Sequence, residues 1–140
     1  MTFEIINPES LGAPRGWNNG MLAPADGRIL FVAGQVASDA SGLVVEEGFI
    51  EQFKRALENV LAVVGGAGGQ ANHIGRLTIY VTDLDAYKSS LKPLGEAYRN
   101  LMGRHFPAMA LVQVKGLLEP NAIVEIEATA VIPRDRGESS

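Results

Sequence analysis

Two carboxylates near the end of the chain are spaced to share one surface. Glu125 and Glu127 lie in residues 122–132, where apolar residues hold most of the other positions. Alternate residues of a strand point to opposite faces, so this run predicts a β-strand with both carboxylates on one face. Such a face meets solvent in a half-exposed strand, whereas in a cleft a carboxylate can position water or move a proton. The spacing leaves both alternatives open.

A second apolar run, residues 107–114, precedes this strand. Gly116, Pro120 and Asn121 lie between the two runs, and residues of these types favour turns. The pattern therefore predicts two strands joined by a turn, with Met109 close to the start of the first.

Four segments, taken as a set, resemble the Rid family (RidA/YjgF, enamine/imine deaminase-like; older label endoribonuclease L-PSP). They are Phe31-Val32-Ala33-Gly34-Gln35, Gln52 through Asn59-Val60-Leu61, Pro107-Ala108-Met109 and Val124-Glu125-Ile126-Glu127-Ala128-Thr129-Ala130. The resemblance spans nearly the whole chain. It implies a chorismate-mutase-like fold and a homotrimer with three clefts between subunits. It also implies hydrolysis of a reactive enamine or imine to a carbonyl compound and ammonia.

The resemblance further implies which residues form the cleft. Glu125 is the catalytic candidate that orients water or moves a proton, and the Gly34 amide holds the substrate, with Trp17, Tyr98 and Met109 as walls. By residue type alone, Trp17 is equally suited to packing in its loop, and Gly34 to a simple turn after a strand. Trp17 matches a tyrosine of the family, so stacking is retained while an ionisable hydroxyl is not.

Met109 departs from the family pattern. Deaminating members carry an arginine there that pairs with the substrate carboxylate, and a thioether cannot replace a charged fork that binds a carboxylate bidentately. The exchange weakens binding or catalysis by roughly 2 to 5 kcal/mol if nothing compensates. Arg76, Arg104 and Lys115 are the candidates for compensation, with ordinary surface or interface charge as the alternative.

Three functions follow as hypotheses, and enzymatic activity is left open among them. The first is enamine or imine hydrolysis with a poor fit for substrates that carry a carboxylate next to the imine. The second is a non-deaminating cleft that binds or transforms a less anionic small molecule, because Met109 and Trp17 make its wall more apolar. The third is a structural or interaction trimer whose cleft is a relic.

Apolar periodicity predicts the elements that position these residues. Helical spacing occurs from Phe49 to a stop at Gly65-Gly66, and again over residues 84–101. Pro93 lies inside the second region, so a kink or a fresh helical start is expected near Lys92. Further strands are predicted at 3–6, 20–23, 28–33 and 74–81, with a loop over 8–20. Residues 20–23 and 28–33 flank Asp26-Gly27 and are predicted to form a hairpin, the second strand being central.

These elements predict a single α+β domain over residues 1–132 with a polar tail at 133–140. Two amphipathic helices cover one face of a mixed sheet, while several strands are apolar on both faces. The second face therefore needs a partner, and a symmetric homo-oligomer is the simplest one.

Composition limits the remaining partners. The 140 residues are 46% hydrophobic with a net charge of −4, which excludes a basic surface for nucleic acid. No cysteine is present, and His73 and His105 lack a ligand spacing, so neither a metal nor a cofactor is expected. No apolar run is long enough for a membrane span and no secretory signal follows Met1, which favours a cytoplasmic protein that binds a small-molecule ligand.

Overall fold

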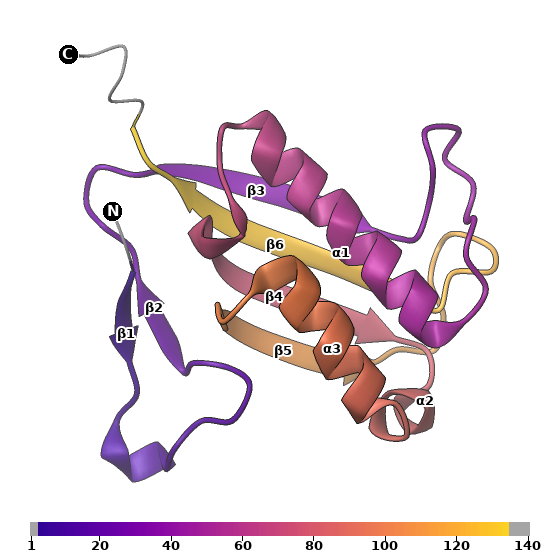
Figure 1. Ribbon diagram of the computed structural model, residues 1–140, viewed down its shortest axis with the longest axis horizontal. Helices are drawn as coiled ribbons and strands as arrows, with labels where there is room; N and C mark the ends of the chain where they lie inside the picture. The colour runs from indigo at the N-terminus through magenta and orange to yellow at the C-terminus, as the bar shows by residue number, and fades with distance from the viewer. Residues whose placement is uncertain (1–2, 135–140) are drawn as a thin grey trace.

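The structure is a computed structural model that describes residues 3–134. Helices lie against one face of a four-stranded mixed sheet, and a two-stranded sheet lies beside it (Figure 1). The predicted α+β class with two main helices on a mixed sheet is confirmed. In chain order the elements are β1 (Glu4–Ile6), η1 (Glu9–Leu11), β2 (Gly20–Leu22), β3 (Arg28–Gln35), α1 (Phe49–Gly66), η2 (Ala71–His73), β4 (Ile74–Val81), α2 (Leu84–Lys88), α3 (Leu91–Met102), β5 (Ala108–Gln113) and β6 (Val124–Ile132).

The strand order β3-β6-β4-β5 decides which residues share a face. β4 runs parallel to β5, and β6 runs antiparallel to both of its neighbours. Leu77 of β4 pairs with Met109 of β5 and with Ala128 of β6, whereas Tyr80 pairs with Glu125. Paired residues point to the same side of a sheet. Met109 therefore lies on the face that the helices cover, called here the covered face, and Glu125 lies on the opposite, open face.

The core fills the space between the covered face and helices α1 and α3. Its side chains are fully buried, and each contributes about 1.5–3 kcal/mol relative to an exposed position. Residues with no exposed surface include Leu57, Val60, Val64, Ile74, Leu77, Val81, Val124 and Ile126. The alternation predicted for residues 122–132 is confirmed, because Val124, Ile126 and Ala128 enter this core, and the predicted strand at 74–81 contributes Leu77, Ile79 and Val81 to it.

Two short-range signals explain how the second helical region divides. Asp83 caps α2, since its carboxylate accepts a hydrogen bond from the Asp85 amide at 2.9 Å. Pro93 lies in the first turn of α3, where its missing N–H is tolerated, so the predicted fresh start is confirmed. α3 ends at Gly103, whose φ of 64° favours glycine.

One predicted strand pairing is wrong, because β2 pairs with β1 rather than with β3. The two strands predicted on either side of a turn are present as β5 and β6, but they are not neighbours in the sheet, since β4 lies between them. A turn signal specifies where a strand ends but not which distant strand it meets.

The prediction that residues 28–33 form a central strand is also wrong. β3 is an edge strand, and on the open face Ile29 and Phe31 are 64% and 79% exposed. Its apolar residues on the covered face meet α1, whereas nothing in residues 3–134 covers the other set. The open face is therefore apolar and exposed at this edge of the sheet.

Smaller differences concern loops and ends. α1 includes Gly65 and Gly66, and the chain takes the left-handed conformation two residues later, at Gly68 with φ 85°. The loop at 8–20 contains the single 3-10 turn η1. The division into a domain at 1–132 and a tail at 133–140 stays a prediction, since residues 135–140 lie outside the described part. Within residues 3–134, no helix has both the length and the apolar character needed to cross a bilayer.

Candidate functional site

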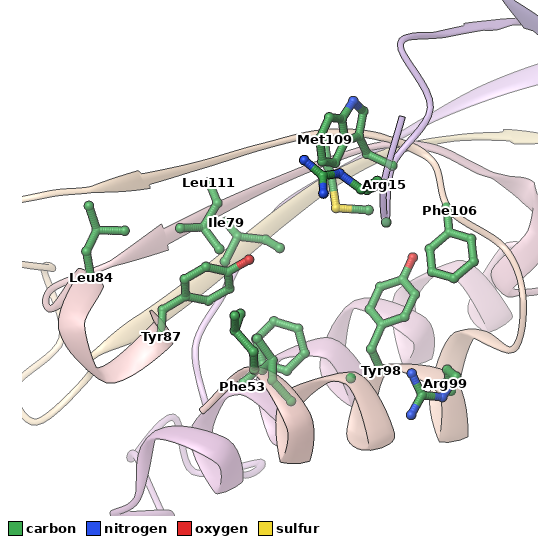
Figure 2. Close-up of a pocket in the computed structure, with 15 residues that line it drawn as sticks. Arg15, Phe53, Ile79, Leu84, Tyr87, Tyr98, Arg99, Phe106, Met109 and Leu111 are labelled. Atoms are coloured by element: carbon green, nitrogen blue, oxygen red, sulfur yellow. The ribbon is translucent and has the colours of Figure 1, made fainter. Parts of the chain in front are cut away.

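A pocket of about 620 Å³ opens on the covered face beside the β5 edge. Figure 2 shows its side chains, which come from β4, β5, the three α-helices, the loop before β2 and the segment before β5. Most of the lining is aromatic or aliphatic. The residues are Arg15, Gly16, Trp17, Phe53, Ile79, Leu84, Tyr87, Leu91, Leu94, Gly95, Tyr98, Arg99, Phe106, Met109 and Leu111.

The strand wall follows from the parallel pairing of β4 and β5. Met109 and Leu111 pair with Leu77 and Ile79, so both reach the covered face instead of the open one. The side-chain oxygen of Gln113 accepts a hydrogen bond from the Leu84 amide at 2.8 Å. This bond attaches the start of α2 to the end of β5, and α2 then contributes Tyr87, whose hydroxyl points into the pocket (Figure 2).

The loop that carries Trp17 is held to the start of β5 by asparagine side chains. The Asn18 amide group donates to the Phe106 carbonyl at 2.6 Å, and Asn7 donates to the Asn18 side-chain oxygen at 2.9 Å. The Asn18 backbone N–H also reaches the Pro107 carbonyl, at 3.4 Å. Trp17 is 42% exposed at the pocket wall, so its ring is accessible instead of serving purely as a packing anchor.

Tyr98 presents a ring to the pocket while its hydroxyl is already used. The hydroxyl donates to the His105 carbonyl at 2.6 Å, and the ring stacks on Phe106 with centroids 5.5 Å apart. Burial raises the pKa of Tyr98 well above its usual value. The side chain therefore stays neutral and acts as a wall rather than as an acid or base.

Glu125 and Gly34 lie together on the open face, away from this pocket. A methyl group added at Gly34 would collide with the Glu125 carboxylate, so the missing side chain of Gly34 leaves room for it. Two residues along β6, Glu127 accepts a hydrogen bond from the Tyr80 hydroxyl at 2.6 Å. That bond, followed by desolvation and the nearby carboxylates, raises the pKa of Tyr80, so Tyr80 is the donor of the pair.

Within one protomer the five residues proposed from the sequence thus form two groups. Trp17, Tyr98 and Met109 line the pocket on the covered face. Gly34 of β3 and Glu125 of β6 lie on the open face. Arg76, Arg104 and Lys115, considered as substitutes for the family arginine, are not among the residues that line the pocket. Twelve of the fifteen lining residues were not proposed from the sequence, and those with charged or aromatic side chains are Arg15, Phe53, Tyr87, Arg99 and Phe106.

The family model described as Endoribonuclease L-PSP matches residues 10–132, which include every candidate residue. A Rid-family protein of unknown function from Yersinia pestis superimposes with a TM-score of 0.82 at 29% identity, covering 94% of this chain and all of that one. The chain belongs to the Rid (YjgF) family. RidA from an Antarctic Psychrobacter has the same fold, with a TM-score of 0.65 at 27% identity, covering 86% and 92% of the two chains.

Curated relatives of this Rid-family chain include one with a named activity. A RutC family protein of Pyrococcus abyssi is 33% identical over 131 residues, which are 93% of this chain and 98% of the relative. The 2-iminobutanoate/2-iminopropanoate deaminase of Homo sapiens is 30% identical over 105 residues, which are 74% and 73% of the two chains. The family and the fold are therefore established, and a deaminase is among the similar proteins.

Proposed function

We propose that this Rid-family chain forms a homotrimer that hydrolyses a reactive enamine or imine to a carbonyl compound and ammonia in clefts between subunits. Similarity to a 2-iminobutanoate/2-iminopropanoate deaminase supports the reaction class. In this proposal one protomer supplies the pocket of Trp17, Tyr98 and Met109. Its neighbour supplies Gly34 and Glu125.

The division of the candidate residues between two faces of one sheet carries this proposal. No carboxylate is among the residues that line the pocket, and Glu125, which has Gly34 beside it, does not line this pocket. A second copy placed against the β5 edge brings the two groups together. The exposed Ile29 and Phe31 on the open face provide apolar surface for that contact.

The chemistry requires one group that moves a proton and one that orients the reacting atoms. Water adds to the C=N carbon, and Glu125 accepts the proton that this water loses. The same carboxyl returns that proton to the imine nitrogen, which gives a carbinolamine. It then moves the hydroxyl proton of the carbinolamine to the same nitrogen, so that the C–N bond breaks, ammonia leaves and the carbonyl forms. The Gly34 amide donates a hydrogen bond to the bound substrate.

Binding without hydrolysis is the second candidate function, and Met109 favours it. The deciding experiment measures ammonia release from imines generated in situ from one acidic and one apolar amino acid. The proposal expects release above the buffer rate for the imine of the apolar amino acid. A protein that binds uncharged apolar ligands but accelerates the hydrolysis of no imine would support the second candidate instead.

Gly34→Ala is expected to impair catalysis with little effect on folding. The new methyl group displaces the Glu125 carboxylate, which sits on a flexible side chain, and misplacing a catalytic group by about 1 Å can reduce the rate roughly 100-fold. The ammonia-release rate and the melting temperature are measured together. Gly65→Ala is the control, since its added methyl group meets open space. An unchanged rate in Gly34→Ala would remove Gly34 and Glu125 from the reacting unit.

Phe31→Glu is expected to prevent trimer assembly, because it places a charge on the apolar open face. Light scattering after gel filtration should give three times the protomer mass for the parent and the mass of one protomer for the variant. Val63→Glu is the control, since Val63 is 38% exposed on α1, on the other side of the molecule. A Phe31→Glu protein that still assembles would exclude this face from the interface.

A further inference from the structure

The charges at the pocket are of one sign. Arg15 and Arg99 are among the fifteen residues that line it, and none of these residues is an aspartate or a glutamate. The chain as a whole is acidic, with a net charge of −4, so this local excess of positive charge is opposite to the overall balance. A cationic edge on an apolar pocket suits an organic anion with an apolar body.

Arg15 is the arginine that the fold holds at the β5 end of the pocket. It lies three residues before Asn18, whose side chain and backbone bind the carbonyls of Phe106 and Pro107. Met109 follows Pro107 by two residues, so these bonds hold the Arg15 loop to the chain segment that leads into Met109. Figure 2 shows Arg15 and Met109 at the same wall of the pocket.

Arg99 lies at the opposite wall, on α3. The Arg99 side chain lies over Gly95, because a methyl group added at Gly95 would come within 3.2 Å of the Arg99 Nη1 atom. Figure 2 shows Arg99 on the helix side, beyond Tyr98. Its charge contributes to the local potential, while the position of Arg15 near Met109 suits direct contact with a ligand.

We propose that Arg15 binds the carboxylate of a substrate whose body is aromatic, replacing the charge that Met109 does not provide. The inference rests on the proposed function, since it names the substrate class of that same cleft. An arginine carried by the loop takes the place of one carried by β5, so the carboxylate approaches from the side of Trp17.

The size and lining of the pocket support the aromatic body. A volume of about 620 Å³ is far larger than a two- or three-carbon side chain occupies, and lies within the range of roughly 300–1,000 Å³ typical of ligand pockets. Aromatic rings at the wall include those of Trp17, Tyr87 and Phe106. Ring-on-ring contacts of this kind add about 0.5–1.5 kcal/mol beyond the burial of area.

Binding of unreactive probes tests the inference without relying on catalysis. Trp17, the single tryptophan, lies in the pocket and reports occupancy by its fluorescence. The probes are 3-phenylpropanoate, its neutral amide and butanoate, which separate the contributions of charge and ring. The variants are Arg15→Gln, Arg99→Gln and Arg104→Gln, the last being an exposed arginine outside the pocket.

The parent should bind 3-phenylpropanoate at least about tenfold more tightly than either other probe, because each lacks one of the two recognised features. Arg15→Gln should weaken the binding of 3-phenylpropanoate roughly tenfold and leave the binding of the neutral amide unchanged. Arg99→Gln should have a smaller effect, and Arg104→Gln none. Equal losses of affinity for 3-phenylpropanoate in the three variants would show that the effect arises from net charge alone. That result would overturn the inference.

Two outcomes separate this inference from the proposed function. Ammonia release that favours small aliphatic imines and is insensitive to Arg15→Gln would overturn the substrate class while the hydrolysis stands. Arginine-dependent binding of 3-phenylpropanoate with no ammonia released from any imine would support Arg15 as the anion-binding residue and reject hydrolysis.

Discussion

Glu125→Gln is expected to lower kcat for ammonia release by roughly 100- to 10,000-fold, the range attributed to a positioned acid or base. The amide keeps the shape of the side chain but cannot accept the proton from water. Binding of 3-phenylpropanoate at the pocket should be retained, because Glu125 is not among the lining residues. Steady-state ammonia release and Trp17 fluorescence measure the two quantities on one preparation.

Glu127→Gln is the matched control on the same strand and the same face. Its amide oxygen can still accept the hydrogen bond from Tyr80, so the local structure is kept and most of the activity should remain. A Glu125→Gln protein with the activity of the parent would show that a different group moves the proton. Equal losses in both variants would indicate a general effect of charge on this face.

Gln52→Ala is expected to lower the free energy of unfolding by about 3–5 kcal/mol, because a cavity and unpaired backbone groups remain in the interior. Gln52 is 1% exposed on α1. Its amide nitrogen donates to the Glu46 and Asn121 carbonyls at 3.0 and 2.8 Å, and its oxygen accepts from the Ile123 amide at 2.9 Å. The Gln52 side chain thus joins α1 to the segment before it and to the loop that precedes β6.

Urea denaturation at a fixed protein concentration measures this change, since assembly would make the midpoint depend on concentration. Lys54→Ala is the control, being exposed on α1 two residues further on. The loop that Gln52 holds leads directly into Glu125, so activity should fall together with stability. A stable Gln52→Ala protein would show that the loop is held by other contacts.

The sequence predicts those parts of the fold that depend on local pattern. β4 begins and ends where its alternation does, at Ile74 and Val81, and Pro93 marks the start of α3. Pairing depends on distant contacts, so the position of β4 between β5 and β6 was not predictable from turn residues. The error at β3 has another cause, because apolar residues such as Phe31 look the same in sequence whether their face is covered or open.

The candidate site shows the same limit. Trp17, Gly34, Tyr98, Met109 and Glu125 were proposed from motifs, and their distribution over two faces required the strand register. Arg15 was missed because it lies in an irregular loop with no periodicity to indicate its direction. Its place depends on the bond from Asn18 to Phe106, which are 88 residues apart in the chain.

The position of β6 inside the sheet sets an order on folding during synthesis. Among residues 3–134, β3 pairs with β6 alone, and β4 has β6 on one side and β5 on the other. A growing chain that has reached residue 123 can form its helices and the β4–β5 pair, but β3 has no strand to join. β6, residues 124–132, is thus the last strand of this sheet to be synthesised, and it joins β3 to β4. Until β6 emerges from the ribosome, the apolar edge of β3 is exposed to chaperones and to other nascent chains.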